Sequence, residues 1–100
     1  MSILDRSQPG RSAQPLELVL YTRDGCHLCD DMKAEIARAG LPECCALREV
    51  DVDSDPALAR RYGESVPVLE IAGRPAFKVR LSREDLRRKI ERALRGREPA

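Results

Sequence analysis

The chain has 100 residues, which is enough for one compact domain and leaves little room for a second core. Hydrophobic residues make up 42% of the chain but aromatic residues only 3%, so the core must consist mainly of Leu, Val, Ile and Ala. The net charge is +1, and no apolar run approaches the roughly 18 residues of a membrane span, so the composition excludes a transmembrane protein.

The first fifteen residues differ in composition from the rest. Residues 1–15 are polar, contain Pro9, Gly10 and Pro15, and show no periodicity. We therefore expect a flexible leader here, followed by one domain over residues 16–97. The leader also lacks the apolar centre of a secretory signal, which favours a cytoplasmic protein.

The domain divides into elements of alternating type. An apolar run over Leu16 to Tyr21 predicts a strand. The next segment, from Cys26 to Ala39, is helical in pattern, and Gly40 should end it. The other expected elements are, in chain order, a strand over 46–52, a short helix that Asp55 caps and Gly63 ends, strands over 67–72 and 75–81, and a last helix between Ser82 and Gly96.

The segment that contains the last of these helices is basic. Residues 74–98 hold ten basic and four acidic residues, whereas residues 24–55 hold nine acidic and three basic ones. A basic helix can bind nucleic acid, but no aromatic interleaving or DNA-binding motif accompanies this one. We therefore interpret the charge as a solvated helix face and expect no nucleic-acid partner.

The order of elements is β-α-β-α-β-β-α, which predicts an α/β domain. Its first half must be a right-handed parallel β-α-β unit, and its second half adds a hairpin and a helix. One four-stranded mixed sheet with helices on both faces would bury the apolar face of each predicted strand and helix.

Two cysteines lie where the first strand gives way to the first helix, in the stretch RDGCHLCDD. Such a pair can bind a metal, form a structural disulfide, or switch between dithiol and disulfide, and structural disulfides are rare in the cytoplasm. A helix N-terminus offers unpaired N–H groups and the positive end of the dipole, both of which stabilise a thiolate. We predict that Cys26, at the exposed helix start, is the nucleophile and that Cys29, one turn further on, is the resolving thiol.

The CxxC motif after the first strand and the pair Val66–Pro67 before the third resemble the thioredoxin fold. The short chain and the sequence SVP are similar to the glutaredoxins, and VDVDSDP is similar to small bacterial glutaredoxin-like proteins, over Leu16 to Arg95. The resemblance implies that Pro67 follows a cis bond and that the Val66 backbone binds the incoming peptide or thiol. From periodicity alone, Pro67 would be a trans proline that opens an edge strand.

The resemblance also assigns a substrate-binding role to Arg23, three residues before the nucleophile, where glutaredoxins have lysine. The chain departs from the glutaredoxin pattern in having His27 and Leu28 between the cysteines, and no Gly-Gly before the last helix. Both glutathione binding and the reductant therefore stay open. His27, if protonated, would favour the Cys26 thiolate and Asp24 would oppose it, but His27 could equally be a solvated side chain.

Two further cysteines, Cys44 and Cys45, precede the second strand. They could be inert small hydrophobes, a redox-sensitive site, or partners of the first pair around zinc or an iron–sulfur cluster. The first helix should separate the two pairs by about 20 Å, which is too far for one mononuclear site.

We therefore predict an enzyme, a glutaredoxin-like thiol–disulfide oxidoreductase that acts on protein or low-molecular-weight disulfides without a bound cofactor or metal. It should be a monomer with a reducing partner, either glutathione or a system like thioredoxin reductase. The alternative is a metal-binding protein or carrier that holds zinc or an iron–sulfur cluster with the same CxxC cysteines.

Overall fold

The computed structural model describes residues 14–97. The flexible leader predicted over residues 1–15 therefore lies outside the described residues, apart from Gln14 and Pro15. None of the helices within residues 14–97 is long and apolar enough to cross a membrane.

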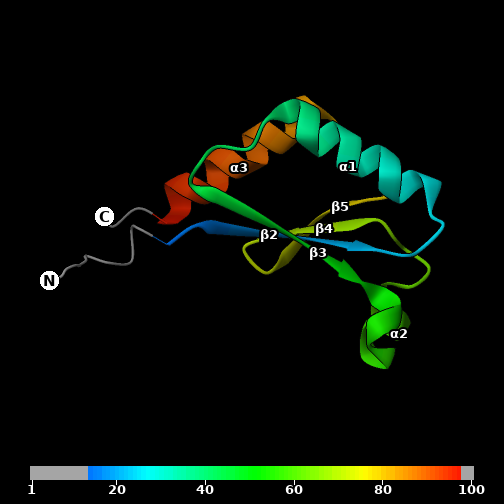
Figure 1. Cartoon of the computed structure of the whole chain (residues 1–100). Coiled ribbons are helices and arrows are strands. Elements are labelled where there is room, and N and C mark those ends of the chain that lie inside the picture. The colour runs from blue at the N-terminus through cyan, green and yellow to red at the C-terminus, as the bar shows by residue number, and fades with distance from the viewer. Residues whose placement is uncertain (1–13, 98–100) are drawn as a thin grey trace, which may run out of the picture.

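Four strands form one mixed sheet in the order β3-β2-β4-β5 (Figure 1). The central strand β2 (Leu16–Thr22) runs parallel to β3 (Cys45–Asp51) and antiparallel to β4 (Val68–Ile71). The last strand, β5 (Arg74–Lys78), pairs with β4 as an antiparallel hairpin. The parallel pair confirms the predicted β-α-β unit, because parallel strands need a crossover connection.

The helices cover both faces of this sheet, as predicted. The helices α1 (His27–Ala39) and α3 (Arg83–Arg97) lie on one face (Figure 1). The short helices η2 (Val52–Ser54) and α2 (Pro56–Tyr62) follow β3, and α2 lies on the other face, near the end of the sheet where α1 begins.

The main core lies between the sheet and the pair α1 and α3. Side chains alternate along a strand, so Leu16, Leu18 and Leu20 all point from β2 toward these helices. The other buried members of this core are Met32, Ile36, Ala39, Leu69, Ile71, Leu86 and Ile90. The apolar face of α1 packs on β2 and thereby fixes the position of the helix. The cysteine motif, which lies at the start of α1, is fixed with it.

The helix ends confirm most of the predicted caps. The Asp55 carboxylate accepts the N–H of Ala57 at 2.9 Å, and the Ser82 hydroxyl accepts the N–H of Asp85 at 3.1 Å. Gly40 ends α1 with a φ of 72°, a conformation that glycine adopts more readily than other residues.

Most predicted element ends differ from the structure by at most one residue, and two of the differences need a physical explanation. The fourth strand was expected to extend to Leu81, but β5 ends at Lys78, because Val79 has a φ of 70° and its N–H donates to the carbonyl of Pro67 at 2.8 Å. The last helix was expected to end at Gly96, but α3 continues through Arg97. Nothing lies within 4 Å of the position a Gly96 Cβ would take, so the glycine is not needed there for a close approach.

A smaller cluster fills the opposite face beneath α2, and it contains a buried carboxylate. Glu70 accepts hydrogen bonds from the hydroxyls of Tyr62 at 2.6 Å and of Tyr21 at 3.3 Å. The two tyrosine rings lie 4.8 Å apart, and burial raises the pKa of Tyr62 to about 12. Val66 packs against this cluster, so the cluster supports the loop that leads into β4.

Candidate active site

The cysteine motif begins in a tight turn after β2. Gly25 has a φ of 76°, and the N–H of Cys26 donates to the carbonyl of Arg23 at 3.3 Å. Cys26 is the N-cap residue of α1, and its Sγ accepts the N–H of Cys29 at 3.1 Å. A sulfur thus takes the capping place usually filled by a Ser, Thr or Asp oxygen, and a backbone donor points at it.

The two cysteines differ in exposure. Cys26 is partly exposed, whereas Cys29 is buried, with 2% of its surface accessible. Burial raises the pKa of Cys29 to about 11, and its hydrogen bond with Cys26 adds to the effect, while the backbone of Arg23 acts in the opposite direction. Near neutral pH Cys29 is therefore a protonated thiol beneath a more accessible Cys26 sulfur.

The residues predicted to tune the couple lie on the surface. Asp24, His27 and Leu28 are all exposed. Within residues 14–97, His27 makes no hydrogen bond or ion pair through its side chain, so a tuning role for it stays a prediction. Leu28 has 40% of its surface accessible, which is high for a large apolar side chain.

Arg23 lies beside the cysteine turn but faces the second half of the chain. Its guanidinium donates twice to the Asp53 carboxylate, from Nε and Nη2, both at 3.0 Å, and from Nη1 to the carbonyl of Gly63 at 3.0 Å. The hydrogen bond with Asp53 raises the pKa of Arg23 above its usual value. The side chain thus links the cysteine turn to η2 and to the end of α2. The sequence did not identify Asp53 as the partner of Arg23, because the stretch VDVDSDP contains three aspartates and nothing in the pattern distinguishes them.

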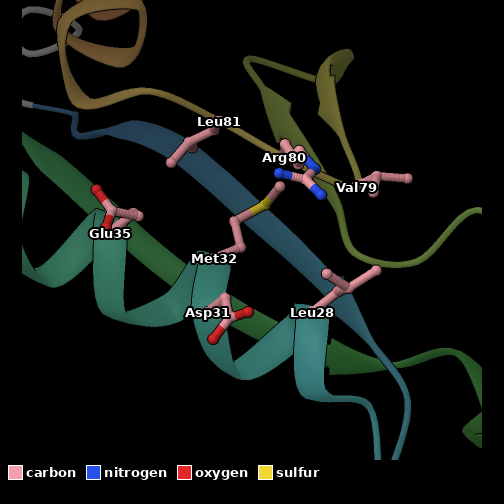
Figure 2. A pocket seen from close by; sticks show the side chains of 7 residues that line it. All are labelled: Leu28, Asp31, Met32, Glu35, Val79, Arg80 and Leu81. Carbon is pink, nitrogen blue, oxygen red and sulfur yellow. The ribbon is translucent and has the colours of Figure 1, made fainter.

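The Val66–Pro67 peptide bond is cis, the form that the resemblance implied, and Pro67 is buried. Its carbonyl accepts the N–H of Val79, so the proline loop is joined to the segment that follows β5. Val79 lines one side of a groove of about 270 Å³ and Leu28 lies on the α1 side (Figure 2). The groove therefore lies between α1 and the segment that follows β5, which are about fifty residues apart in sequence.

The remaining lining of this groove, here named the Leu28–Val79 groove, comes from the same two segments. Figure 2 shows Met32 reaching from α1 toward the segment 79–81, with Asp31 and Glu35 also on α1. Arg80 and Leu81 complete the opposite wall. The sequence contains one signal for this groove, the leucine between the two cysteines. It contains no signal that the segment 79–81 forms the opposite wall.

A second hollow, of about 390 Å³, lies on the other side of the cysteine turn. Its lining is strongly polar, and it contains Cys29 together with four carboxylates and two cations. The residues that line it are Thr22, Arg23, Asp24, Gly25, Cys29, Asp30, Lys33, Glu49 and Asp51. Lys33 pairs with Glu49 at 3.0 Å, so the cation is already engaged. We refer to this site as the acidic hollow.

The second cysteine pair lies at the far end of the sheet. Cys45 pairs with Leu16 at the start of β2, whereas Cys26 follows the end of the same strand at Thr22. In Figure 1 the start of β3 and the start of α1 lie at opposite ends of the molecule. No group of three or more His, Cys, Asp or Glu side chains within residues 14–97 is placed to share a metal ion.

Comparison with known proteins assigns the family. The glutaredoxin-like domain family (DUF836) matches residues 17–91. The chain belongs to this family. No curated protein sequence gives a match.

Solved structures agree with this glutaredoxin-like assignment. The structural-genomics target protein XcR50 from X. campestris is 37% identical with a TM-score of 0.64, covering 75% of this chain and 96% of that one. Protein Ne2328 from Nitrosomonas europaea is 28% identical with a TM-score of 0.64, covering 76% and 92%. A mutant thioredoxin from Halobacterium salinarum is 27% identical with a TM-score of 0.57, covering 81% and 76%. The glutaredoxin-like domain therefore has the thioredoxin fold, and this supports a function of the redox type.

Proposed function

We propose that this glutaredoxin-like protein is a thiol–disulfide oxidoreductase that uses Cys26 and Cys29 as its dithiol/disulfide couple. The observation that carries the proposal is the capping geometry. The Cys26 sulfur stands at the start of α1, partly exposed and in hydrogen-bond contact with the N–H of Cys29. A nucleophilic thiolate needs both features, an accessible sulfur and donors that stabilise its charge.

The reaction follows from the difference between the two thiols. The Cys26 thiolate attacks one sulfur of a substrate disulfide, so a mixed disulfide forms and the other substrate sulfur leaves as a thiolate. Cys29 then loses its proton to solvent and attacks the Cys26 sulfur, which releases the second substrate thiolate and leaves a Cys26–Cys29 disulfide. The substrate gains two electrons and the protein loses two. Two equivalents of an external thiol, or one of a dithiol, restore the reduced pair.

The neighbouring residues have supporting roles in this proposal. Val66 presents its backbone beside Pro67 to the incoming chain. Arg23 holds the cysteine turn against η2 through Asp53 and against the end of α2 through the carbonyl of Gly63. A reducing partner, either glutathione or a system like thioredoxin reductase, would complete the cycle. The enzyme is expected to act as a monomer in the cytoplasm, without a resident cofactor.

The test is turnover of a small disulfide with dithiothreitol as the regenerating dithiol, combined with metal analysis of protein purified under reducing conditions. The proposal expects catalysis of disulfide reduction and no stoichiometric metal. Stoichiometric zinc or iron together with no turnover would favour the metal-binding alternative and overturn it.

A trapping assay assigns the two cysteines. A Cys29→Ser variant should accumulate mixed disulfides through Cys26, because nothing is left to resolve them. A Cys26→Ser variant should accumulate none. Equal trapping by both variants would mean that the two roles are wrongly assigned.

A further inference from the structure

We propose that the substrate of the Cys26–Cys29 pair is a polypeptide disulfide, with an apolar side chain beside its cysteine and Lys or Arg around it, and not an anionic small disulfide such as glutathione disulfide. This inference rests on the proposed function and names the substrate class of the same site. Three features of the surface around Cys26 lead to it.

The first feature is the Leu28–Val79 groove. Leu28 and Val79 have 40% and 38% of their surfaces accessible, and they face the same hollow from opposite walls. Its volume of about 270 Å³ is below the range of about 300–1,000 Å³ that is usual for small-molecule sites. Four of its seven lining residues are apolar, and one of these, Leu28, comes two residues after the attacking Cys26, so the groove can take one apolar side chain of a bound polypeptide.

The second feature is the charge around the cysteines. Four acidic residues and two basic ones line the acidic hollow, which gives a formal charge of −2. Its two cations are engaged, since Arg23 binds Asp53 and Lys33 binds Glu49.

Three carboxylates around the cysteines lack such an ion pair. Two of them, Asp24 and Asp30, are among the four acids of the acidic hollow, and the third, Asp31, lines the Leu28–Val79 groove. Within the described part of the chain, Asp24, Asp30 and Asp31 form no ion pair with a basic side chain. Asp30 moreover acts on Cys29 itself, as one of the causes that raise the thiol pKa. Asp30 also helps to raise the pKa of Lys33. The net charge around the cysteines is nevertheless negative, so this surface should attract cationic chains and repel anionic ones.

The third feature is that most donors near the cysteine turn that could hold a carboxylate are occupied. Arg23 directs three N–H groups at Asp53 and Gly63. In the loop after β5, the N–H of Val79 donates to Pro67 and that of Arg80 donates to Lys78. The exception is the Arg80 guanidinium, which lines the groove together with Asp31. The third charged residue of the groove, Glu35, is already paired with Arg38 and Arg83. Glutathione disulfide, which carries four carboxylates, would find few free donors here.

The test uses four symmetrical disulfides with the fully reduced protein. Three are made from short peptides with the cores Lys-Leu-Cys-Lys, Gln-Leu-Cys-Gln and Glu-Leu-Cys-Glu, and the fourth is glutathione disulfide. The second-order rate constant of each is divided by its rate constant with dithiothreitol, which corrects for the intrinsic reactivity of the disulfide. At about 10 mM salt the corrected rate should be at least about tenfold higher for the Lys peptide than for the Glu peptide or glutathione disulfide. The difference should shrink at about 0.5 M salt, because salt screens exposed charges.

Equal corrected rates for the Lys and Glu peptides, or a faster reaction of glutathione disulfide, would overturn the inference and leave the proposed function standing. If the protein reduces none of the four disulfides, the proposed function has failed and the inference with it. The outcomes for the two proposals are therefore distinguishable.

Variants locate the effect on the surface. Asp30→Asn removes one charge from the acidic hollow, and the ratio of the Lys rate to the Gln rate should fall by about two- to threefold. Glu43→Gln removes the same charge in the exposed segment that precedes β3, at the far end of the sheet, and should leave this ratio unchanged. Leu28→Ser should reduce the rate of the Gln-Leu-Cys-Gln peptide relative to one with Gly in place of Leu. Equal effects of Asp30→Asn and Glu43→Gln, or no effect of Leu28→Ser on the Leu preference, would contradict the assigned surface.

Discussion

The molecule contains two cysteine pairs, at opposite ends of the same strand, and they differ in almost every property that decides reactivity. Cys26 and Cys29 are three residues apart at the start of a helix, where one backbone donor points at the outer sulfur. Cys45 is the first residue of β3, and Cys44 lies in the turn just before it. Cys44 is exposed, and its carbonyl accepts the N–H of Leu16.

The comparison teaches that spacing and secondary structure together make a redox pair. A separation of three residues at a helix start places Cys29 one turn above Cys26, on the side that packs into the core. The result is one accessible sulfur and one protected sulfur within reach of each other. The predictions below test whether reactivity follows this difference, in order of decreasing effect.

The largest effect is expected from Cys26→Ser. Disulfide-reductase turnover should fall by at least about 100-fold, because a serine hydroxyl is a far weaker nucleophile than a thiolate at neutral pH. Turnover of a small disulfide with dithiothreitol as reductant measures it. A variant that keeps more than a tenth of the wild-type rate would mean that another cysteine carries the reaction.

The next effect is a loss of stability at high pH. Burial raises the pKa of Cys29 to about 11 and that of Tyr62 to about 12, so the folded chain holds both protons to a higher pH than the unfolded chain does. Their contribution to stability is fully present below the unfolded pKa values of about 8.5 and 10, and is lost as the pH rises to 11 and 12. Urea unfolding between pH 8 and 12 should show this decline.

Matched variants separate the two groups in that experiment. Cys29→Ala should flatten the decline between about pH 8.5 and 11, and Tyr62→Phe the part between about 10 and 12. Phe77→Leu removes no ionisable group and should leave the slope unchanged. If Cys29→Ala keeps the full slope below pH 10, the cysteine is not protected as the structure indicates.

A smaller loss of stability is expected where Arg23 meets α2. A Cβ on Gly63 would clash with the carbonyl of Ala59 and lie 2.8 Å from Nη2 of Arg23. Gly63→Ala should therefore reduce the free energy of unfolding by about 1–3 kcal/mol, whereas Gly96→Ala, in open space within α3, should raise it by up to about 1 kcal/mol. Denaturant unfolding at pH 7 compares them, and equal effects would contradict the close packing around Gly63.

The smallest effect is expected from Cys44→Ser. Cys44 is exposed and far from the cysteine turn, so turnover should change by less than about twofold and stability by less than about 0.5 kcal/mol. Turnover is measured as for Cys26→Ser, and stability by denaturant unfolding at pH 7. A large loss of turnover would mean that Cys44 takes part in the reaction, and would contradict the assignment of the reaction to Cys26 and Cys29 alone.

The sequence predicts the features that depend on neighbours in the chain. The helix caps at Asp55 and Ser82, the parallel unit and the placement of Cys26 before α1 all follow from patterns a few residues long. The failures have tertiary causes. Val79 is a β-branched residue that adopts a positive φ while its N–H binds the Pro67 carbonyl, and no local pattern predicts that strand end.

The candidate site shows the same division. The CxxC motif is local and was predicted, whereas its surroundings are assembled from distant segments. Arg23 pairs with Asp53, thirty residues away, and Leu28 shares a groove with Val79, about fifty residues away. Sequence reasoning placed Arg23 as a substrate-binding residue, and the structure shows its donors directed at η2 and α2. Such contacts depend on how the elements pack, which periodicity does not specify.

The central claim is that Cys26 and Cys29 form one intramolecular two-electron couple. The most direct measurement oxidises the reduced wild-type protein in a buffer of oxidised and reduced dithiothreitol, alkylates the remaining thiols, and maps the disulfides by peptide mass spectrometry. The account predicts a Cys26–Cys29 disulfide in monomeric protein, with Cys44 alkylated. A disulfide that joins Cys26 to Cys44, or oxidation that leaves both Cys26 and Cys29 alkylated, would contradict it.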